Sequence, residues 1–402
     1  MKILLQINTS INSGSTGRIA EEIGKLAMAN GWVSYIAAGR TINISQSHYI
    51  KIGNTLSVYW HVLMTRLFDR HGLASLNATK KLIKQIQSIA PDVIHLHNIH
   101  GYYINYKILF DYLRNANIPV VWTLHDCWAY TGHCTYYSFS KCDKWKLQCS
   151  DCINKKDYPK SLLFDRSYKN YREKKNIYNL PKSMILVPVS KWLAKELEES
   201  FLYKYPIKQI HNGIDLDLFK PVQNDIKKNF SIENKFLILG VAGVWSNRKG
   251  LSDFISLSKM VSSDMVIMLI GLNKKQIKSL PSNIIGLQRT DNVLELAEIY
   301  STADVFVNPT WEDNYPTTNL ESIACGTPVI TYRTGGSIES VTDQTGFIVE
   351  QGDIKDLFFL IETIKNKGKQ VYFQACRNYA INHFNKNECY NEYLSLYETT
   401  IK

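Results

Sequence analysis

Two acidic side chains in the segment 311–328 have the types and spacing needed to bind the hydroxyl groups of a sugar or a ribose. The segment contains the run WEDNYPTTNLE, in which Asp313 and Glu321 flank a polar turn. Pro316 suits the first turn of a helix, so the turn is predicted to lead into a helix N-terminus. Free backbone N–H groups and the positive end of the helix dipole make such a terminus an anion site. The alternative role for Asp313 is to cap this helix.

A pair of cations follows another apolar run. The run 236–241 is predicted to be a strand, and Arg248 and Lys249 come shortly after it, beside Gly250. Arg offers a planar fork of donors and Lys a point charge, so the two together could clamp a diphosphate. An isolated Arg-Lys pair is more often solvated surface. The occurrence of this pair together with the acidic pair in one half of the chain favours the diphosphate site.

Three histidines follow predicted strands in the N-terminal half. His125 comes directly after the run 120–124, and His97 and His100 follow the run 93–96. Because open parallel sheets bind ligands at the carboxyl ends of their strands, His125 is predicted to face a ligand cleft. His97 and His100 could line the side of that cleft that takes an acceptor, and the alternative is that they orient the loop that follows them.

Four cysteines form a candidate metal site. Five of the eight cysteines lie between residues 127 and 152, and the candidate ligands are Cys134, Cys142, Cys149 and Cys152. In a reducing compartment disulfides are disfavoured and tetrahedral Zn²⁺ becomes the leading explanation, with free thiols as the alternative. Four thiolates leave no open coordination position, so the zinc would be structural. It is expected to pin an insert, 128–158, that is too polar to hold itself together.

The scaffold for these residues is predicted to be two doubly wound parallel sheets, an α/β fold. Gly14, in the polar loop after the first strand, permits a close approach of the backbone to a ligand, although glycines also serve ordinary turns. The segment 211–225 is predicted to link the two halves. The predicted strands are 2–7, 33–38, 93–96, 120–124 and 185–189 in the first half, and 236–241, 266–270, 284–287, 305–307, 329–331 and 347–349 in the second.

Length and composition are those of a globular enzyme with two or three domains. The chain has 402 residues, of which 45% are hydrophobic and 21% charged, which excludes disordered, collagen-like and disulfide-scaffold proteins. The longest uncharged, mostly apolar run, 236–247, is shorter than the roughly 20 residues that span a bilayer. The first residues do not resemble a signal peptide, so a cytoplasmic protein without a membrane anchor is expected.

The basic charge is concentrated in one stretch. The formal net charge is +11, and residues 141–208 contain sixteen Lys or Arg against eight Asp or Glu. Aromatic residues are interleaved with these cations: Tyr158, Phe164, Tyr168, Tyr171 and Tyr178. The stretch could be a solvated face, or a surface that lies on anionic lipid headgroups. Nucleic acid would also suit the charge, but no nucleic-acid motif accompanies it.

Both functional patches resemble glycosyltransferase family 4. Asp313 and Glu321 have the spacing of the family's acidic pair, with Asp at a position where the family usually has Glu. In the patch 243–250, Val244 stands where the family has Arg; Lys249 is retained and Arg248 is taken as the substitute. The runs 212–215, 69–72, 95–103 and 123–126 also resemble the family, the last three a bacterial subgroup that builds capsular and exopolysaccharides.

The resemblance implies a GT-B fold of two facing Rossmann-like domains. The first domain would hold residues 1–210, with a C-terminal helix, 385–402, that crosses back to it, and the second would hold residues 211–384. The implied enzyme transfers a sugar with retention of configuration from a nucleotide-diphosphate sugar to a lipid-linked saccharide. It would work at the inner face of the cytoplasmic membrane, as a peripheral protein on an anionic surface, with no cofactor needed for catalysis.

The resemblance also assigns roles to residues. His125 and Asp313 would contact the transferred sugar as catalytic residues, and His97 and His100 would lie on the acceptor side. The donor would be bound by Gly14, Arg248, Lys249, Asn314, Thr317, Thr318 and Glu321. The alternatives are a sugar-nucleotide epimerase with the same fold, or a nucleic-acid-binding module built on the basic insert; the leading hypothesis includes no nucleic acid partner.

Overall fold

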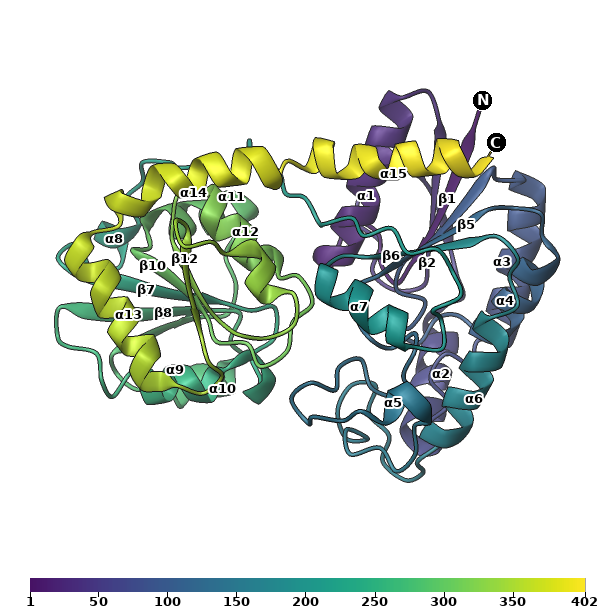
Figure 1. Cartoon of the computed structure of the whole chain (residues 1–402), viewed down its shortest axis with the longest axis horizontal. Coiled ribbons are helices and arrows are strands. Elements are labelled where there is room, and N and C mark those ends of the chain that lie inside the picture. Colours follow the sequence, from purple (N-terminus) through teal and green to yellow (C-terminus); the bar gives the residue numbers. More distant parts are fainter. Residues whose placement is uncertain (402) are drawn as a thin grey trace. The chain divides into compact units, whose positions relative to one another are not determined.

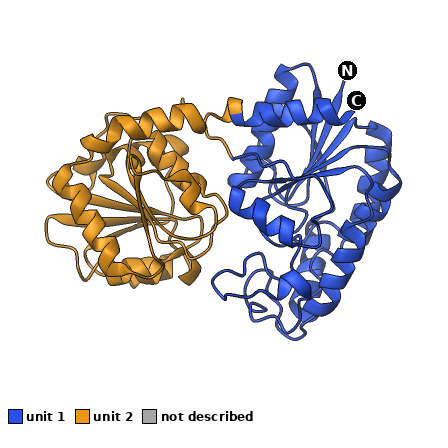
Figure 2. Ribbon diagram, viewed as in Figure 1, with its two compact units in different colours: residues 1–211, 389–402 blue, residues 212–388 orange. Residues whose placement is uncertain are grey.

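The chain folds into two compact units. The computed structural model describes residues 1–401 (Figure 1). Unit 1 comprises Met1–His211 and the chain from Cys389 on, and unit 2 comprises Asn212–Glu388 (Figure 2). Each unit contains one six-stranded sheet, and all the strand pairs in both sheets are parallel.

The sheet of unit 1 has the order β3-β2-β1-β4-β5-β6. Its strands are β1 (Ile3–Asn8), β2 (Val33–Ala38), β3 (His48–Lys51), β4 (Val93–Leu96), β5 (Val120–Leu124) and β6 (Met184–Pro188). The helices of this unit are α1 (Gly14–Ala29), α2 (Thr55–Phe68), α3 (Leu76–Ile89), α4 (Tyr106–Asn115), α5 (Lys144–Leu147), α6 (Ser167–Tyr178) and α7 (Lys191–Glu199).

The sheet of unit 2 has the order β12-β11-β10-β7-β8-β9. Its strands are β7 (Phe236–Val241), β8 (Met265–Ile270), β9 (Ile284–Leu287), β10 (Val305–Asn308), β11 (Val329–Tyr332) and β12 (Gly346–Val349). Its helices are α8 (Ile226–Asn229), η1 (Asn247–Lys249), α9 (Leu251–Leu257), α10 (Lys274–Lys278), α11 (Val293–Thr302), α12 (Thr317–Ala324), η2 (Ser337–Ser340), α13 (Ile354–Lys367) and α14 (Gln370–His383). The last helix, α15 (Lys386–Ile401), begins in unit 2 and continues in unit 1.

The predicted fold class is confirmed, and each predicted strand is present with ends that differ by no more than one residue. Apolar runs buried on both faces are typical of parallel sheets, which is why these strands could be found in the sequence. The one strand not predicted is β3, an edge strand in which only Ile50 is buried. Its exposed polar residues carry no hydrophobic pattern.

The two faces of the first sheet carry separate cores. In β1, Leu5 and Ile7 belong to one core and Leu4 to the other, because successive side chains of a strand point to opposite faces. The core that contains Leu4 is completed by α15, from which Tyr393 and Tyr397 are fully or almost fully buried. Residues of α15 are therefore part of the core of unit 1.

A buried chain of hydrogen bonds joins α15 to the middle of this sheet. The Tyr397 hydroxyl lies 2.6 Å from Nδ1 of His95, whose Nε2 lies 2.7 Å from Oγ1 of Thr123. The Thr123 hydroxyl in turn donates to the hydroxyl of Tyr393. Burial holds the pKa of His95 well below its usual value, so the ring is neutral and its Nδ1 accepts a hydrogen bond from the Tyr397 hydroxyl. Both ring nitrogens are thereby satisfied inside the protein.

The expectation that the insert 128–158 is too polar to hold itself together is wrong. Trp128, Tyr130, Tyr137 and Trp145 are all buried in the main core of unit 1. The ammonium of Lys174 lies 3.4 Å from the centroid of the Trp128 ring, and it donates to the carbonyl of Trp128. A few large aromatic side chains thus supply the apolar surface that the polar composition of the insert conceals.

No helix within residues 1–401 has both the length and the apolar character required to cross a bilayer.

Candidate active site

Two loops of unit 2 meet because Gly250 has no side chain. Gly250 ends η1 with φ +78°, and a Cβ built there would lie 2.2 Å from the carbonyl oxygen of Pro309, just after β10. The Trp311 N–H donates to the carbonyl of Arg248 over 2.8 Å. These contacts bring the loop that carries the two cations beside the loop that carries the acidic pair.

Each cation bonds to the acidic loop. Nζ of Lys249 forms an ion pair with Oδ2 of Asp313, and both side chains are mostly buried. Nη1 of Arg248 donates to the carbonyl of Glu312 over 2.8 Å. The structure therefore joins Lys249 to Asp313 directly, while Arg248 also supports the backbone of the loop.

The helix after this loop begins without a capping side chain. The N-cap position of α12 is Pro316, and within residues 1–401 no side-chain cap bond is made to this helix, so the alternative in which Asp313 caps the helix is wrong. Oδ1 of Asp313 instead accepts the N–H of Asn314 over 3.0 Å. The first helical residues are Thr317 and Thr318. A helix N-terminus without a cap can receive an anion.

Buried polar groups fix the orientation of α12. Glu321 is 6% exposed and accepts a hydrogen bond from the Tyr300 hydroxyl over 3.1 Å. On the same helix, Asn319 accepts from Asn308 of β10 and donates to the hydroxyl of Ser340. Such a satisfied network inside the protein permits one orientation of the helix and therefore one position for Glu321.

The histidines of unit 1 form a row in which each proton can be assigned. Nε2 of Gln6 donates to the carbonyl of Ala20, so its Oε1 accepts from Nε2 of His97 over 3.0 Å. Nδ1 of His97 must then accept, and the N–H at Nε2 of His125 donates to it over 3.2 Å. In this arrangement Nδ1 of His125 carries a lone pair.

Burial keeps these rings neutral. Desolvation lowers the pKa of His125 to about 4 and holds the pKa of His97 well below its usual value. At neutral pH the lone pair on Nδ1 of His125 can therefore accept a hydrogen bond, for example from a hydroxyl group. The ring is not an acid under these conditions.

The other predicted residues of unit 1 lie in loops that follow strands. Nε2 of His100 lies 2.8 Å from Oδ2 of Asp126, and both residues line a small cavity with His97 and His125. Gly14 is the first residue of α1, with φ +66°; apart from its chain neighbours and the backbone of its own helix, no atom of residues 1–401 lies within 4 Å of the position of a Cβ. The predicted site residues thus form two groups, one in each unit.

The four candidate metal ligands line one cavity together with a histidine that sequence analysis missed. A cavity of about 20 Å³ is bordered by His133 and by Cys134, Cys142, Cys149 and Cys152. As the side chains stand, no three His, Cys, Asp or Glu residues within residues 1–401 are arranged to hold a metal ion. Nδ1 of His133 lies 2.6 Å from Oδ1 of Asp69, whereas its buried Nε2 has no hydrogen-bond partner within that range.

Family models match both halves of the chain. The model described as "Glycosyltransferase Family 4" matches residues 19–218, and the model "Glycosyl transferases group 1" matches residues 234–365. The chain belongs to glycosyltransferase family 4. The predicted family is thereby confirmed, and the enzyme is a glycosyltransferase.

Curated relatives of this glycosyltransferase include a putative colanic acid biosynthesis glycosyl transferase of Escherichia coli. It is 22% identical over 369 residues, which cover 88% of this chain and 89% of the relative. An N,N'-diacetylbacillosaminyl-diphospho-undecaprenol alpha-1,3-N-acetylgalactosaminyltransferase of Campylobacter jejuni is 23% identical over 47% of this chain and 53% of its own length.

Solved structures with the same fold include sucrose-phosphate synthase from Thermosynechococcus elongatus. It superposes with a TM-score of 0.74 at 16% identity and covers 99% of both chains. HepE of Anabaena in complex with UDP-glucose superposes with a TM-score of 0.68 at 16% identity, covering 98% of this chain and 100% of HepE. These superpositions confirm the two-domain α/β fold of this glycosyltransferase.

Substitution of Gly250 by alanine is expected to separate the two loops of unit 2. A Cβ at Gly250 would clash with the Pro309 carbonyl, in a backbone conformation that disfavours side chains, so the free energy of unfolding should fall by roughly 2–4 kcal/mol. Gly243→Ala is the matched control, because its Cβ would have no neighbour within 4 Å. Urea unfolding that gave equal stability for both variants would contradict this account of the loops.

Because His125 is neutral in the folded enzyme, we expect the free energy of unfolding to fall as the pH is lowered. Between a folded pKa of about 4 and an unfolded pKa of about 6.5, the unfolded chain binds the His125 proton and the folded chain does not, so stability falls as pH falls. Urea unfolding at pH 7 and at pH 5 measures this loss of stability. From pH 7 to pH 5 the free energy of unfolding should fall by about 2 kcal/mol less in His125→Gln than in wild type. The exposed His48→Gln should behave like wild type, and an unchanged loss in His125→Gln would refute the assignment.

Proposed function

We propose that the enzyme is a retaining glycosyltransferase that moves a sugar from a nucleoside-diphosphate sugar to a lipid-linked saccharide during the synthesis of a bacterial surface polysaccharide. The observation that carries the proposal is the Lys249–Asp313 pair beside the uncapped α12 and its buried Glu321. The names of the Escherichia coli and Campylobacter jejuni relatives support the polysaccharide and the lipid-linked acceptor. The HepE complex supports a nucleotide-sugar donor.

Unit 2 would bind the donor. The diphosphate would lie between Lys249 and the N-terminus of α12, where the N–H groups and hydroxyls of Thr317 and Thr318 can donate to phosphate oxygens. Its arrival would compete with Asp313 for the ammonium of Lys249, so the carboxylate would become available to the sugar hydroxyls. Arg248 would contribute positive charge while its bond to the loop is kept, and Asn314 would line the same turn.

The nucleoside would be recognised by Glu321. Its carboxylate is fixed by the Tyr300 hydroxyl and by the buried network of α12, so it needs no reorganisation to accept two ribose hydroxyls. A carboxylate that accepts from two neighbouring hydroxyls fits a ribose. This is the role that the family resemblance gives to Glu321.

Unit 1 would contact the transferred sugar and position the acceptor. Nδ1 of neutral His125 would accept a hydrogen bond from a hydroxyl of the transferred sugar, because the N–H of this ring, at Nε2, already donates to His97. His97 and His100 would lie on the acceptor side, and the open space around Gly14 would allow the backbone to approach the diphosphate or the acceptor.

The proposed reaction is a displacement on one face of the sugar. The bond between the anomeric carbon and the diphosphate oxygen breaks with its electrons going to the diphosphate, and the acceptor hydroxyl attacks from the same face. The leaving phosphate takes the proton of the attacking hydroxyl, so no protein nucleophile is required. Lys249, Arg248 and the α12 N–H groups stabilise the charge that develops on the diphosphate.

Glu321→Gln is expected to weaken nucleotide binding without unfolding the enzyme. The charge-assisted bonds to the ribose would be lost, which should reduce affinity for the nucleoside diphosphate by roughly tenfold to a hundredfold. Thermal unfolding of wild type with uridine, guanosine and adenosine diphosphates should show stabilisation by at least one of them, and the variant should lose most of that stabilisation.

Asp343→Asn is the matched control, since it removes one carboxylate from an exposed position of the same unit. It should retain the stabilisation of wild type. Equal stabilisation of wild type and Glu321→Gln would remove Glu321 from the donor site. If none of the three nucleotides stabilised wild type, the proposed donor class would be wrong.

We also propose that the cysteine cavity holds a structural zinc ion. Support comes from the cavity that the four thiols share with His133, and from the position of Asp69 on the other nitrogen of that ring. Histidines that bind metals usually donate their second N–H to a carboxylate, which leaves Nε2 for the metal. Four of these five side chains, rotated toward the cavity, would supply the sulfur and nitrogen ligands of a tetrahedral zinc site.

Metal analysis of the purified enzyme tests the proposed zinc ion. Wild type is expected to contain about one zinc per chain, and Cys149→Ser with Cys152→Ser should lose it together with several degrees of melting temperature. Cys376→Ser, a buried cysteine of unit 2, should keep the metal. A zinc content near zero in wild type, or an unchanged content in the double variant, would contradict the proposal.

A further inference from the structure

One face of α2 is apolar and exposed. Leu56, Tyr59, Trp60 and Leu63 recur at helical spacing, and each residue is between 45% and 77% exposed. Residues with this spacing normally form the buried side of a helix. Here the helix turns His61 and Thr65 toward the protein instead. A contiguous apolar face in water indicates a binding surface.

The apolar surface continues past the end of α2. The ring of Phe68 stacks on Phe164, with centroids 5.7 Å apart and planes inclined by 16°. Backbone bonds from Leu162 to Arg66 and from Phe164 to Leu67 hold the segment 162–164 against the helix end. Leu162, Leu163 and Phe164 are all more than half exposed. The surface therefore extends beyond the length of α2.

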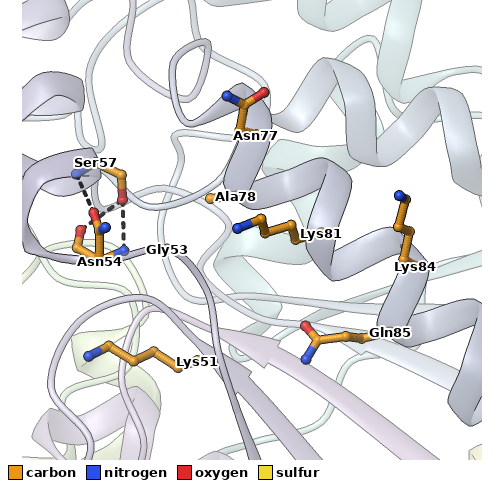
Figure 3. Close-up of a pocket in the computed structure, with 9 residues that line it drawn as sticks. All are labelled: Lys51, Gly53, Asn54, Ser57, Asn77, Ala78, Lys81, Lys84 and Gln85. Carbon is orange, nitrogen blue, oxygen red and sulfur yellow. Dashed lines mark hydrogen bonds between the residues drawn. The ribbon is translucent and has the colours of Figure 1, made fainter.

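A basic pocket lies beside the first turn of the same helix. It has a volume of about 670 Å³ and is lined by Lys51 from the end of β3, by Lys81 and Lys84 from α3, and by Asn54 and Ser57 of the α2 cap (Figure 3). Asn54 and Ser57 bond to each other reciprocally, as Figure 3 shows, so the wall they form is fixed. Within residues 1–401 none of the three lysines has an ion-pair partner.

The charge of this region has one sign. Between residues 44 and 91 the sequence contains six Lys or Arg and a single acidic residue, Asp69. Asp69 is buried against His133 and does not offset the exposed lysines. A surface that combines exposed Trp, Tyr and Leu with unpaired lysines matches the interface of an anionic bilayer, where aromatic rings lie at headgroup level and lysines meet lipid phosphates.

The structure points to this surface as the membrane-docking face of the enzyme. We infer that α2 lies in the plane of the bilayer with Tyr59 and Trp60 among the headgroups, and that the pocket of Lys51, Lys81 and Lys84 receives the phosphate of an anionic lipid. The inference rests on the proposed action on a lipid-linked acceptor. It moves the expected lipid contact from the basic stretch 141–208 to α2, with Phe164 of that stretch as an added part.

The stretch 141–208 is less suited to this role than its composition suggests. Lys174 is buried, Arg166 pairs with Glu173, and Lys146 pairs with Glu199. Of its interleaved aromatic residues, Tyr171 and Tyr178 are buried in the core. Part of its charge and of its aromatic surface is therefore already used inside unit 1.

Flotation of the full-length enzyme with lipid vesicles tests the inference. Wild type should bind vesicles of phosphatidylcholine with phosphatidylglycerol and bind phosphatidylcholine alone much more weakly. Replacing Lys51, Lys81 and Lys84 by Gln should weaken binding to the anionic vesicles by about 100-fold, since each basic residue contributes about fivefold. The matched control replaces three exposed lysines of α10, Lys274, Lys275 and Lys278, by Gln and should bind like wild type.

A second pair of variants tests the apolar face. Tyr59→Ser with Trp60→Ser should weaken vesicle binding at least tenfold, while Tyr203→Ser, an equally exposed tyrosine elsewhere in unit 1, should not. Wild-type binding that resists both the lysine and the aromatic changes would overturn the inference. So would light scattering that shows a dimer of wild type which Trp60→Ser dissociates, because the face would then be covered by a second copy.

The nucleotide experiment separates this inference from the proposed function. Glu321→Gln should bind vesicles like wild type, and the α2 variants should keep the stabilisation by a nucleoside diphosphate. If wild type is stabilised by a nucleoside diphosphate but does not bind the anionic vesicles, the docking face alone is refuted. Vesicle binding by wild type without any nucleotide stabilisation would refute the proposed donor class alone.

Discussion

The close approach of Gly250 to the Pro309 carbonyl is the constraint on which the second unit's candidate site depends. The two strands β7 and β10 are neighbours in the sheet, so the loops that follow them leave the same edge. A side chain at Gly250 would push these loops apart. With hydrogen at this position, Lys249 reaches Asp313 and the Arg248 carbonyl accepts from Trp311. One missing methyl group thus sets the position of the cations relative to the acids.

In unit 1, hydrogen bonds within the fold decide which ring nitrogen of His97 and of His125 carries the proton. The carbonyl of Ala20 fixes Gln6, Gln6 fixes the tautomer of His97, and Nδ1 of His97 accepts the hydrogen bond that His125 donates. Burial lowers the pKa of both rings, so neither takes up a second proton at neutral pH. The histidine that stands at the end of β5 is therefore an acceptor, and its chemistry is decided by residues of β1 and α1 that have no contact with solvent.

The fold was largely predictable because parallel strands are continuous apolar runs, and the positions of Lys249, Asp313 and His125 after such runs follow from the same pattern. The contact of Lys249 with Asp313 could not be predicted, since it depends on a pairing of residues far apart in sequence. The same applies to His133, whose partner Asp69 lies in another segment. The outward face of α2 was missed for a different reason: apolar residues at helical spacing look the same whether they face the core or solvent.

The contribution of α15 to the first core has a consequence for biosynthesis. Tyr393 and Tyr397 cover Leu4 and its neighbours, yet they are made after the whole of unit 2. At about 5–20 residues per second, roughly 10–40 s separate residue 211 from residue 397 on the ribosome. During that interval one face of the nascent N-terminal sheet is covered by α1 without α15 and keeps part of its apolar surface exposed, while the second unit can close its own core first.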